Sequence, residues 1–84
     1  MGINETKEYI GINYTEDDNL LQRCRDAAEV FLKNAGVVKQ ESNPLYELAV
    51  DMLTEHWFDN RGVVGDVKEI PLGLEAIVVQ LRLV

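Results

Sequence analysis

The segment from Leu45 to Asn60 places the strongest restriction on how this 84-residue chain can fold. Asn43 and Pro44 stand directly before it, and proline at the first helical position is typical of a helix start. As a helix, the segment has two adjoining apolar sides, made of Leu45, Leu48, Ala49, Met52 and His56 and of Tyr46, Val50, Leu53 and Trp57. The other side carries Glu47, Asp51, Thr54, Glu55 and Phe58. A helix that is apolar over so much of its circumference is either central in a bundle or covered by another molecule.

A second amphipathic helix is predicted upstream, in the sequence YTEDDNLLQRCRDAAEVFLKNAG at positions 14–36. Thr15 can cap this helix, and the acidic residues after it suit the positive end of the helix dipole. Gly36 suits a left-handed C-terminal cap. A calcium loop is disfavoured because its turn glycine is missing. The predicted inward stripe consists of Leu20, Cys24, Ala27, Ala28 and Phe31.

Two shorter segments complete the predicted architecture. The sequence NETKEYIG at positions 4–11 predicts about two helical turns, capped by Asn4 and ending at Gly11. The C-terminal segment is ambiguous, because Pro71 can open a helix whereas the β-branched run Ile77–Val79 also suits a strand. A helix there would carry Leu74, Ile77, Val78 and Leu81 on one face, and we prefer it because the chain offers no second strand. The sequence thus predicts one all-α domain over residues 1–84, a small bundle of about four helices with two longer antiparallel helices between a short first and a short C-terminal helix.

The charge and the cysteine count narrow the class of protein. The net charge is −7, and the eight basic residues form no run, so direct binding to nucleic acid is disfavoured. An acidic wall along which DNA slides without sticking remains compatible with this charge. A single cysteine excludes an internal disulfide and fits a reducing compartment. The charged opening residues do not suggest a secretion signal, and no apolar stretch is long enough for a bilayer.

The sequence offers little that could support catalysis or bind a cofactor. His56 and Cys24, the sole histidine and cysteine, both fall on apolar stripes and are expected to be core residues facing each other. Glu55, His56 and Asp59 could touch one metal ion, but Glu55 points away from His56 around the helix. The glycines form no phosphate-binding motif. We therefore expect no enzyme activity, no metal and no cofactor.

The chain has more apolar surface than so small a domain can bury, which indicates an interaction site. The predicted interface consists of Phe58, Arg61, Val63, Val64, Ile70, Leu72, Val79 and Leu83. The predicted core consists of Leu20, Cys24, Ala27, Phe31, Leu48, Met52, His56 and Trp57. For Trp57 an interface role is an equal alternative, because tryptophan is favoured at interface hot spots.

Three stretches of the chain, taken in order, match the pattern of one protein family. ETKEYIGINYTEDDNLLQRCRDAAEVFL has the pattern of its short first helix, acidic turn and second helix. PLYELAVDMLTEHWFDNRGVVGD is similar to its long helix with a His-Trp-(Tyr/Phe)-x-Asn-Arg ending, and EIPLGLEAIVVQLRL to its Ile-Pro-x-Gly tail. By these stretches the chain resembles the small head–tail connector proteins of tailed bacteriophages, the adaptor family that forms a ring beneath the portal.

This resemblance implies a helical bundle without catalysis and a closed ring of about a dozen copies made by head-to-tail contacts. The ring would extend the DNA channel of the portal protein, bind a stopper or tail-completion protein below, and complete the head after DNA packaging. The chain would then be found at the head–tail junction of the virion, after assembly in the bacterial host cytoplasm. Arg61 would meet an acidic residue of a neighbouring copy.

The chain departs from the family pattern in one connector and at its end. NAGVVKQESNP is short where many members carry a longer segment, so we transfer no family contact site to it. Because the sequence ends at Val84, we expect the longer portal-gripping C-terminal arm of some members to be missing. The alternative function is a small acidic helical regulatory or adaptor protein that binds a protein partner as a monomer or dimer. A helix-turn-helix DNA binder is a weaker alternative, because the best candidate recognition helix is acidic.

Overall fold

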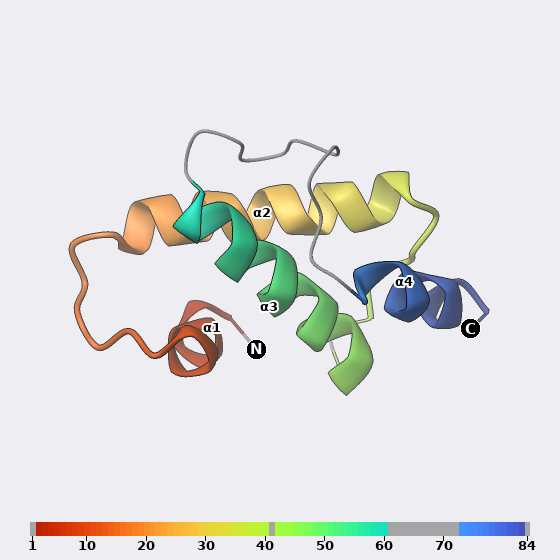
Figure 1. The fold of residues 1–84 in the computed structure, drawn as a ribbon, viewed down its shortest axis with the longest axis horizontal. Coiled ribbons are helices and arrows are strands. Elements are labelled where there is room, and N and C mark those ends of the chain that lie inside the picture. Colours follow the sequence, from red (N-terminus) through yellow and green to blue (C-terminus); the bar gives the residue numbers. More distant parts are fainter. Residues whose placement is uncertain (1, 41, 61–72, 84) are drawn as a thin grey trace.

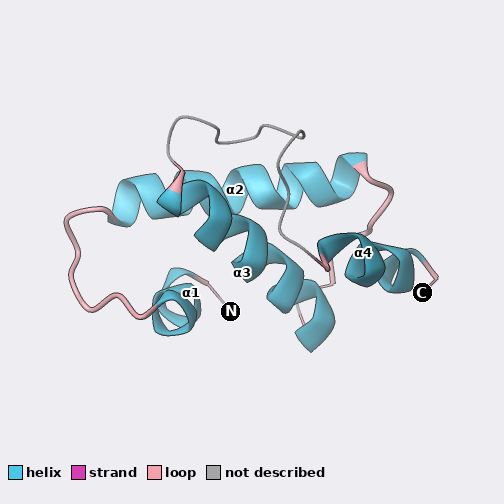
Figure 2. Cartoon of the chain, viewed as in Figure 1, coloured by secondary structure: helices cyan, strands magenta, loops and turns pink. Residues whose placement is uncertain are grey.

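A computed structural model describes residues 2–40, 42–60 and 73–83, and in these ranges the chain forms helices and no strand (Figures 1 and 2). The four helices are α1 (Ile3–Ile10), α2 (Asp18–Asn34), α3 (Pro44–Asp59) and α4 (Leu74–Arg82). Figure 1 shows α2 and α3 running in opposite directions, with α1 near the start of α2 and α4 near its end. The all-helical prediction is confirmed, including the helical alternative for the C-terminal segment.

Helix α3 is the central element, because it packs against each of the other three helices. Ala49, Val50, Leu53 and Trp57 on this helix are fully buried. Of the two alternatives that the sequence left open for this helix, the structure shows the central position, although the side that faces outward differs from the prediction.

The outward stripe of α3 is not the one that the sequence pattern indicated. Leu48 was predicted in the core but is 38% exposed. Met52, also predicted in the core, and Glu55, which follow along the same helix, are partly exposed. Glu47 and Asp51, which the sequence analysis placed on the side opposite the apolar ones, are buried. The physical reason is that other helices supply polar partners for these two carboxylates, so the side of α3 that carries charge can turn inward.

Helix α2 is rotated by about one residue from the predicted orientation. Its buried residues are Leu21, Cys24, Arg25, Ala28 and Leu32. The predicted stripe therefore holds for Cys24 and Ala28, whereas Leu20, Ala27 and Phe31 are only partly buried and flank the core. The predicted stripe was built from apolar residues alone and so left out the buried Arg25.

The predicted start of α3 and the predicted end of α2 are both confirmed. The Asn43 side-chain oxygen accepts a hydrogen bond from the Leu45 backbone N–H at 2.9 Å. Gly36 has a φ of +91°, and the backbone N–H of Val37 donates to the Leu32 carbonyl oxygen at 2.9 Å. These contacts satisfy polar groups that the helix ends leave open.

The predicted starts of α1 and α2 are wrong. Helix α2 begins after Asp17 instead of Thr15, and Asp17 makes no side-chain cap. Helix α1 begins after Gly2 instead of Asn4, and the Gly2 backbone N–H donates to the Glu5 carboxylate at 2.8 Å. This contact gives one of the open N–H groups of the helix start a local partner.

Helix α4 buries Leu74, Val78 and Leu81, with Ile77 packed at the edge of the core. These are the four residues that the sequence placed on one face, whereas Pro71 lies outside the described residues. Across the described part of the chain, the helices are too short or too polar to cross a membrane.

Candidate functional site

The predicted interface residues fall into three groups. Arg61, Val63, Val64, Ile70 and Leu72 lie outside the described residues. Val79 and Leu83, on and just after α4, are exposed, Leu83 to 81%. Phe58 is only 7% exposed and belongs to the core cluster, as does the neighbouring Trp57. The structure therefore places the Phe58 ring inside the subunit, which corrects its placement on an outer surface.

The paired residues His56 and Trp57 differ in their surroundings. The Trp57 side chain is fully buried, and its ring meets the Phe31 ring edge-on at a centroid distance of 5.9 Å. His56 is partly exposed, although its Nε2 atom is buried. Among the described residues, neither His56 Nε2 nor Trp57 Nε1 has a hydrogen-bond partner. Cys24 is fully buried on α2, and the geometry therefore places Trp57 and Cys24 in the core.

A buried polar network joins α1, α2 and α3, and the sequence analysis missed it. Arg25 on α2 lies with its Nη1 atom 3.4 Å from Asp51 Oδ1 and its Nη2 atom 3.6 Å from Glu47 Oε1. Arg25 Nη1 also donates to the hydroxyl of Thr6, and this hydroxyl donates to Asp51 Oδ1 at 2.7 Å. The signal that could have found the network is the four-residue spacing of Leu21 and Arg25, which puts a cation on the apolar stripe.

The network holds two largely buried carboxylates against one buried guanidinium. Burial raises the pKa of the Asp51 carboxyl above its ordinary value of 3.8, and the Thr6 hydrogen bond and the Arg25 charge oppose this shift. Because the folded carboxyl binds its proton more tightly than the unfolded one, the contribution of Asp51 to stability is complete below pH 3.8. This contribution is lost as the pH rises through the folded pKa.

The variant Asp51→Asn tests whether the contribution of Asp51 to stability decreases as the pH rises. Asparagine keeps an oxygen that accepts from Thr6 but carries no charge, so its contribution does not change between pH 3 and 7. We expect the stability of Asp51→Asn relative to the original chain to increase as the pH rises through this window. Urea unfolding followed by far-UV circular dichroism at several pH values measures the difference. A difference that is constant or decreases with pH would contradict the assignment.

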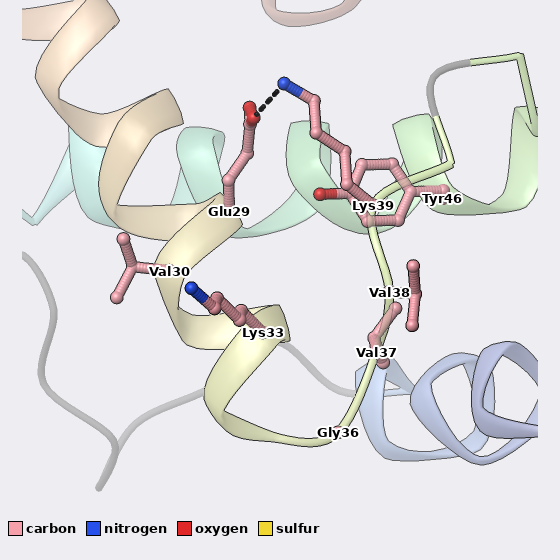
Figure 3. Close-up of a pocket in the computed structure, with 8 residues that line it drawn as sticks. All are labelled: Glu29, Val30, Lys33, Gly36, Val37, Val38, Lys39 and Tyr46. Atoms are coloured by element: carbon pink, nitrogen blue, oxygen red, sulfur yellow. Dashed lines mark ion pairs between the residues drawn. The ribbon is translucent and has the colours of Figure 1, made fainter.

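An apolar groove lies beside the C-terminal half of α2 (Figure 3). The connector after α2 forms one wall with Val37 and Val38, α2 forms the other with Val30, and Tyr46 of α3 lines it between them. Val38 is 75% exposed and Val30 more than half exposed. The groove has a volume of about 580 Å³, within the range of about 300–1,000 Å³ typical of ligand pockets.

Basic side chains stand on the rim of this groove. Lys39 Nζ lies 3.1 Å from the Glu29 carboxylate, as the dashed line in Figure 3 marks. Lys33, on the last turn of α2, is exposed and makes no ion pair with any described residue. The groove therefore combines an apolar floor with an exposed cation that no described residue pairs, which suits a ligand that carries both apolar and acidic groups.

A second hollow adjoins the groove at the same end of the bundle. It is lined by Phe31, Ala35, Leu74, Glu75, Val78, Val79 and Arg82. The Arg82 side chain reaches Gly36, where an added Cβ atom would lie 3.4 Å from the Arg82 Nε atom. The predicted interface residue Val79 thus lines a hollow whose Arg82 reaches the Gly36 turn of the groove, although the sequence analysis assigned no site to the connector.

No metal site emerges from the described residues, where no three His, Cys, Asp or Glu side chains are placed to share an ion. In particular, Glu55, His56 and Asp59 border a shallow polar hollow with Tyr9 without forming such a group. The surface features with a clear chemical preference are therefore the apolar groove and the exposed face of α4.

Comparison with known proteins gives one match that extends along almost the whole chain. The family model described as phage gp6-like head-tail connector protein matches residues 1–82. No curated protein and no solved structure matches the chain.

Proposed function

The chain belongs to the phage gp6-like head-tail connector family, and we propose that its copies close into a ring below the portal at the head–tail junction of the virion. The family makes the chain a structural phage connector protein. The ring, its place below the portal and its action after DNA packaging are the parts that we add. Residues 1–84 would act as a single connector domain.

The match over residues 1–82 carries this proposal, and the exposed aliphatic side chains support it. Val30, Val38, Val79 and Leu83 are all exposed around the end of α2 and α4. A chain of this size gains stability when neighbours cover such side chains. Because these residues gather at one end of an elongated bundle, they suit contacts between successive copies.

The charge of the chain supports a channel role. A net charge of −7 disfavours attachment to the DNA backbone, so DNA can pass through the ring without being held. We propose that the ring contacts the portal protein on one side and a stopper or tail-completion protein on the other. Assembly would take place in the bacterial host cytoplasm.

Light scattering and negative-stain imaging test the ring, at dilute and concentrated protein and with the portal protein of the same phage. We expect closed rings, either of the chain alone at high concentration or on the portal. A monomer under every condition would contradict the proposal. A stable dimer that ignores the portal would contradict it in favour of a small regulatory adaptor.

Arg61 provides a variant for the same assay. If Arg61 pairs with an acidic residue of a neighbouring copy, Arg61→Glu places two like charges together and is expected to abolish the rings. Arg23→Glu makes the same charge change on the exposed surface of α2 and serves as the control. Intact rings from Arg61→Glu would remove Arg61 from the interface.

A further inference from the structure

The two ends of α2 carry opposite charge. Glu16, Asp17 and Asp18 stand at its start, where Lys7 of α1 lies 2.9 Å from the Asp18 carboxylate, whereas Lys33 lies in its last turn. Lys39 and Arg82 add positive charge near that end, against Glu29 and Glu75. At about 1.5 Å per residue, the 17 residues of α2 separate these ends by roughly 25 Å. Among these charges, the start of α2 is therefore net acidic and its end is net basic by one charge, although the net charge of the chain is strongly negative.

The acidic end also presents an aromatic side chain. Tyr14, in the loop between α1 and α2, is 40% exposed, and its hydroxyl donates to Asp17 Oδ2 at 3.3 Å. Glu16, two residues later, is exposed. Figure 1 shows this loop at the opposite end of the bundle from the connector that forms the groove. An aromatic ring beside a carboxylate matches the groove at the other end, which offers apolar side chains and the positive charge of Lys33.

We propose that the groove of one copy receives the Tyr14–Glu16 loop of a second copy of this chain. The Tyr14 ring lies on Val30 and Val38, and the Glu16 carboxylate pairs with Lys33. This inference rests on the proposed function, because it names the surfaces through which successive copies of the ring meet. It also assigns a contact to the short connector, to which the family pattern transferred none.

Charge complementarity selects this pairing over the alternatives between identical copies. Two groove ends would bring Lys33 near its own counterpart, and two loop ends would bring acidic clusters together, so both symmetric pairings are disfavoured. A groove that receives a loop from the opposite end makes a head-to-tail contact. Such a contact leaves each copy with one free groove and one free loop, and it closes into a ring when the rotation between copies permits.

A charge swap tests the proposal. In Glu16→Lys, the substituted loop of one copy meets Lys33 of the next copy, so two positive charges face each other. In Lys33→Glu, the substituted groove of one copy meets Glu16 of the next copy, so two negative charges face each other. Each variant alone is therefore expected to associate at least about tenfold more weakly than the original chain. When the two variants are mixed in equal amounts and alternate, Lys33 of one meets Glu16 of the other, and at the next junction the two substituted residues form the same ion pair in reverse. Association should then return. Both positions are exposed, so neither substitution disturbs the core. Lys33→Gln is the control that removes charge without reversing it, and it should weaken association less than Lys33→Glu.

Nuclear magnetic resonance of the original chain over a concentration series locates the contact. Backbone signals of Val30, Val38 and Tyr14 are expected to shift together as association proceeds. Shifts at one end only, or a mixture of the two variants that stays dissociated, would overturn the head-to-tail pairing. Rings that survive both charge variants would overturn it as well, while leaving the connector function in place. An original chain that never associates, with or without the portal protein, would remove the connector function itself and this inference with it.

Discussion

Replacement of Arg25 by methionine is expected to lower the free energy of unfolding by about 3–5 kcal/mol, a large fraction of the stability of an 84-residue chain. Methionine retains much of the apolar stem but removes the guanidinium that lies 3.4 Å from Asp51 and 3.6 Å from Glu47. Both carboxylates would then be buried without a cation. The loss of stability arises mainly from these two unpaired carboxylates, because a buried charge without a partner is strongly unfavourable.

Urea unfolding followed by far-UV circular dichroism, at concentrations where the chain is monomeric, measures this loss. Arg23→Met is the matched control, because Arg23 lies on the same helix but is exposed, and surface substitutions change stability by about 0.5 kcal/mol or less. Equal losses for the two variants would show that Arg25 acts only through the general charge of the chain, which would contradict the network.

A combined variant separates the network from the fold. Thr6→Val, Arg25→Met, Glu47→Met and Asp51→Leu together replace every polar member by an apolar side chain. Apolar replacement of a complete buried ion group is often neutral or stabilising, so most of the loss is expected to return. The network then serves to fix how α1, α2 and α3 meet more than to stabilise them. Failure to recover would mean that the polar contacts supply net stability.

This network also marks where sequence reasoning reached its limit. Periodicity limited α3 to a central position or one covered by another molecule, because apolar side chains on most of a helix circumference need neighbours on most sides. It failed on which side of α3 faces out, because Glu47 and Asp51 count as polar residues whatever their partners. A buried carboxylate becomes acceptable only when a distant Arg25 reaches it, and one-dimensional spacing does not contain that distance.

The groove shows the same limit at the surface. The sequence analysis predicted surplus apolar surface and an interface role for Val79 and Leu83, which are exposed, but it assigned no site to the connector. The groove exists because Gly36 turns the chain with a φ of +91°, which brings Val38 back alongside Val30. A glycine signal predicts the turn, whereas the direction in which the following residues run depends on how α3 packs against α2.

Replacement of Trp57 by alanine is expected to cost about 3–5 kcal/mol, because the largest side chain of the core is removed and its neighbours cannot fill the space. The ring is fully buried and meets Phe31 edge-on, so the variant also loses an aromatic contact. Trp57→Phe keeps part of this packing and should cost roughly 1–2 kcal/mol. Far-UV circular dichroism must be the probe, since Trp57 is the sole tryptophan and its fluorescence is lost with it.

Leu48→Ala, on the same helix, is the control that decides between the two orientations of α3. If α3 had the orientation that the sequence predicted, Leu48 would lie in the core, and its truncation to alanine would lower the free energy of unfolding by about 2–5 kcal/mol. In the observed orientation it is 38% exposed, and we expect a loss of about 0.5–1 kcal/mol. A Leu48→Ala loss as large as that of Trp57→Ala would contradict the inward position of Glu47 and Asp51. A small Leu48→Ala loss beside a large Trp57→Ala loss ties the central helix to its polar network, because the turn that exposes Leu48 is the one that brings Asp51 to Arg25.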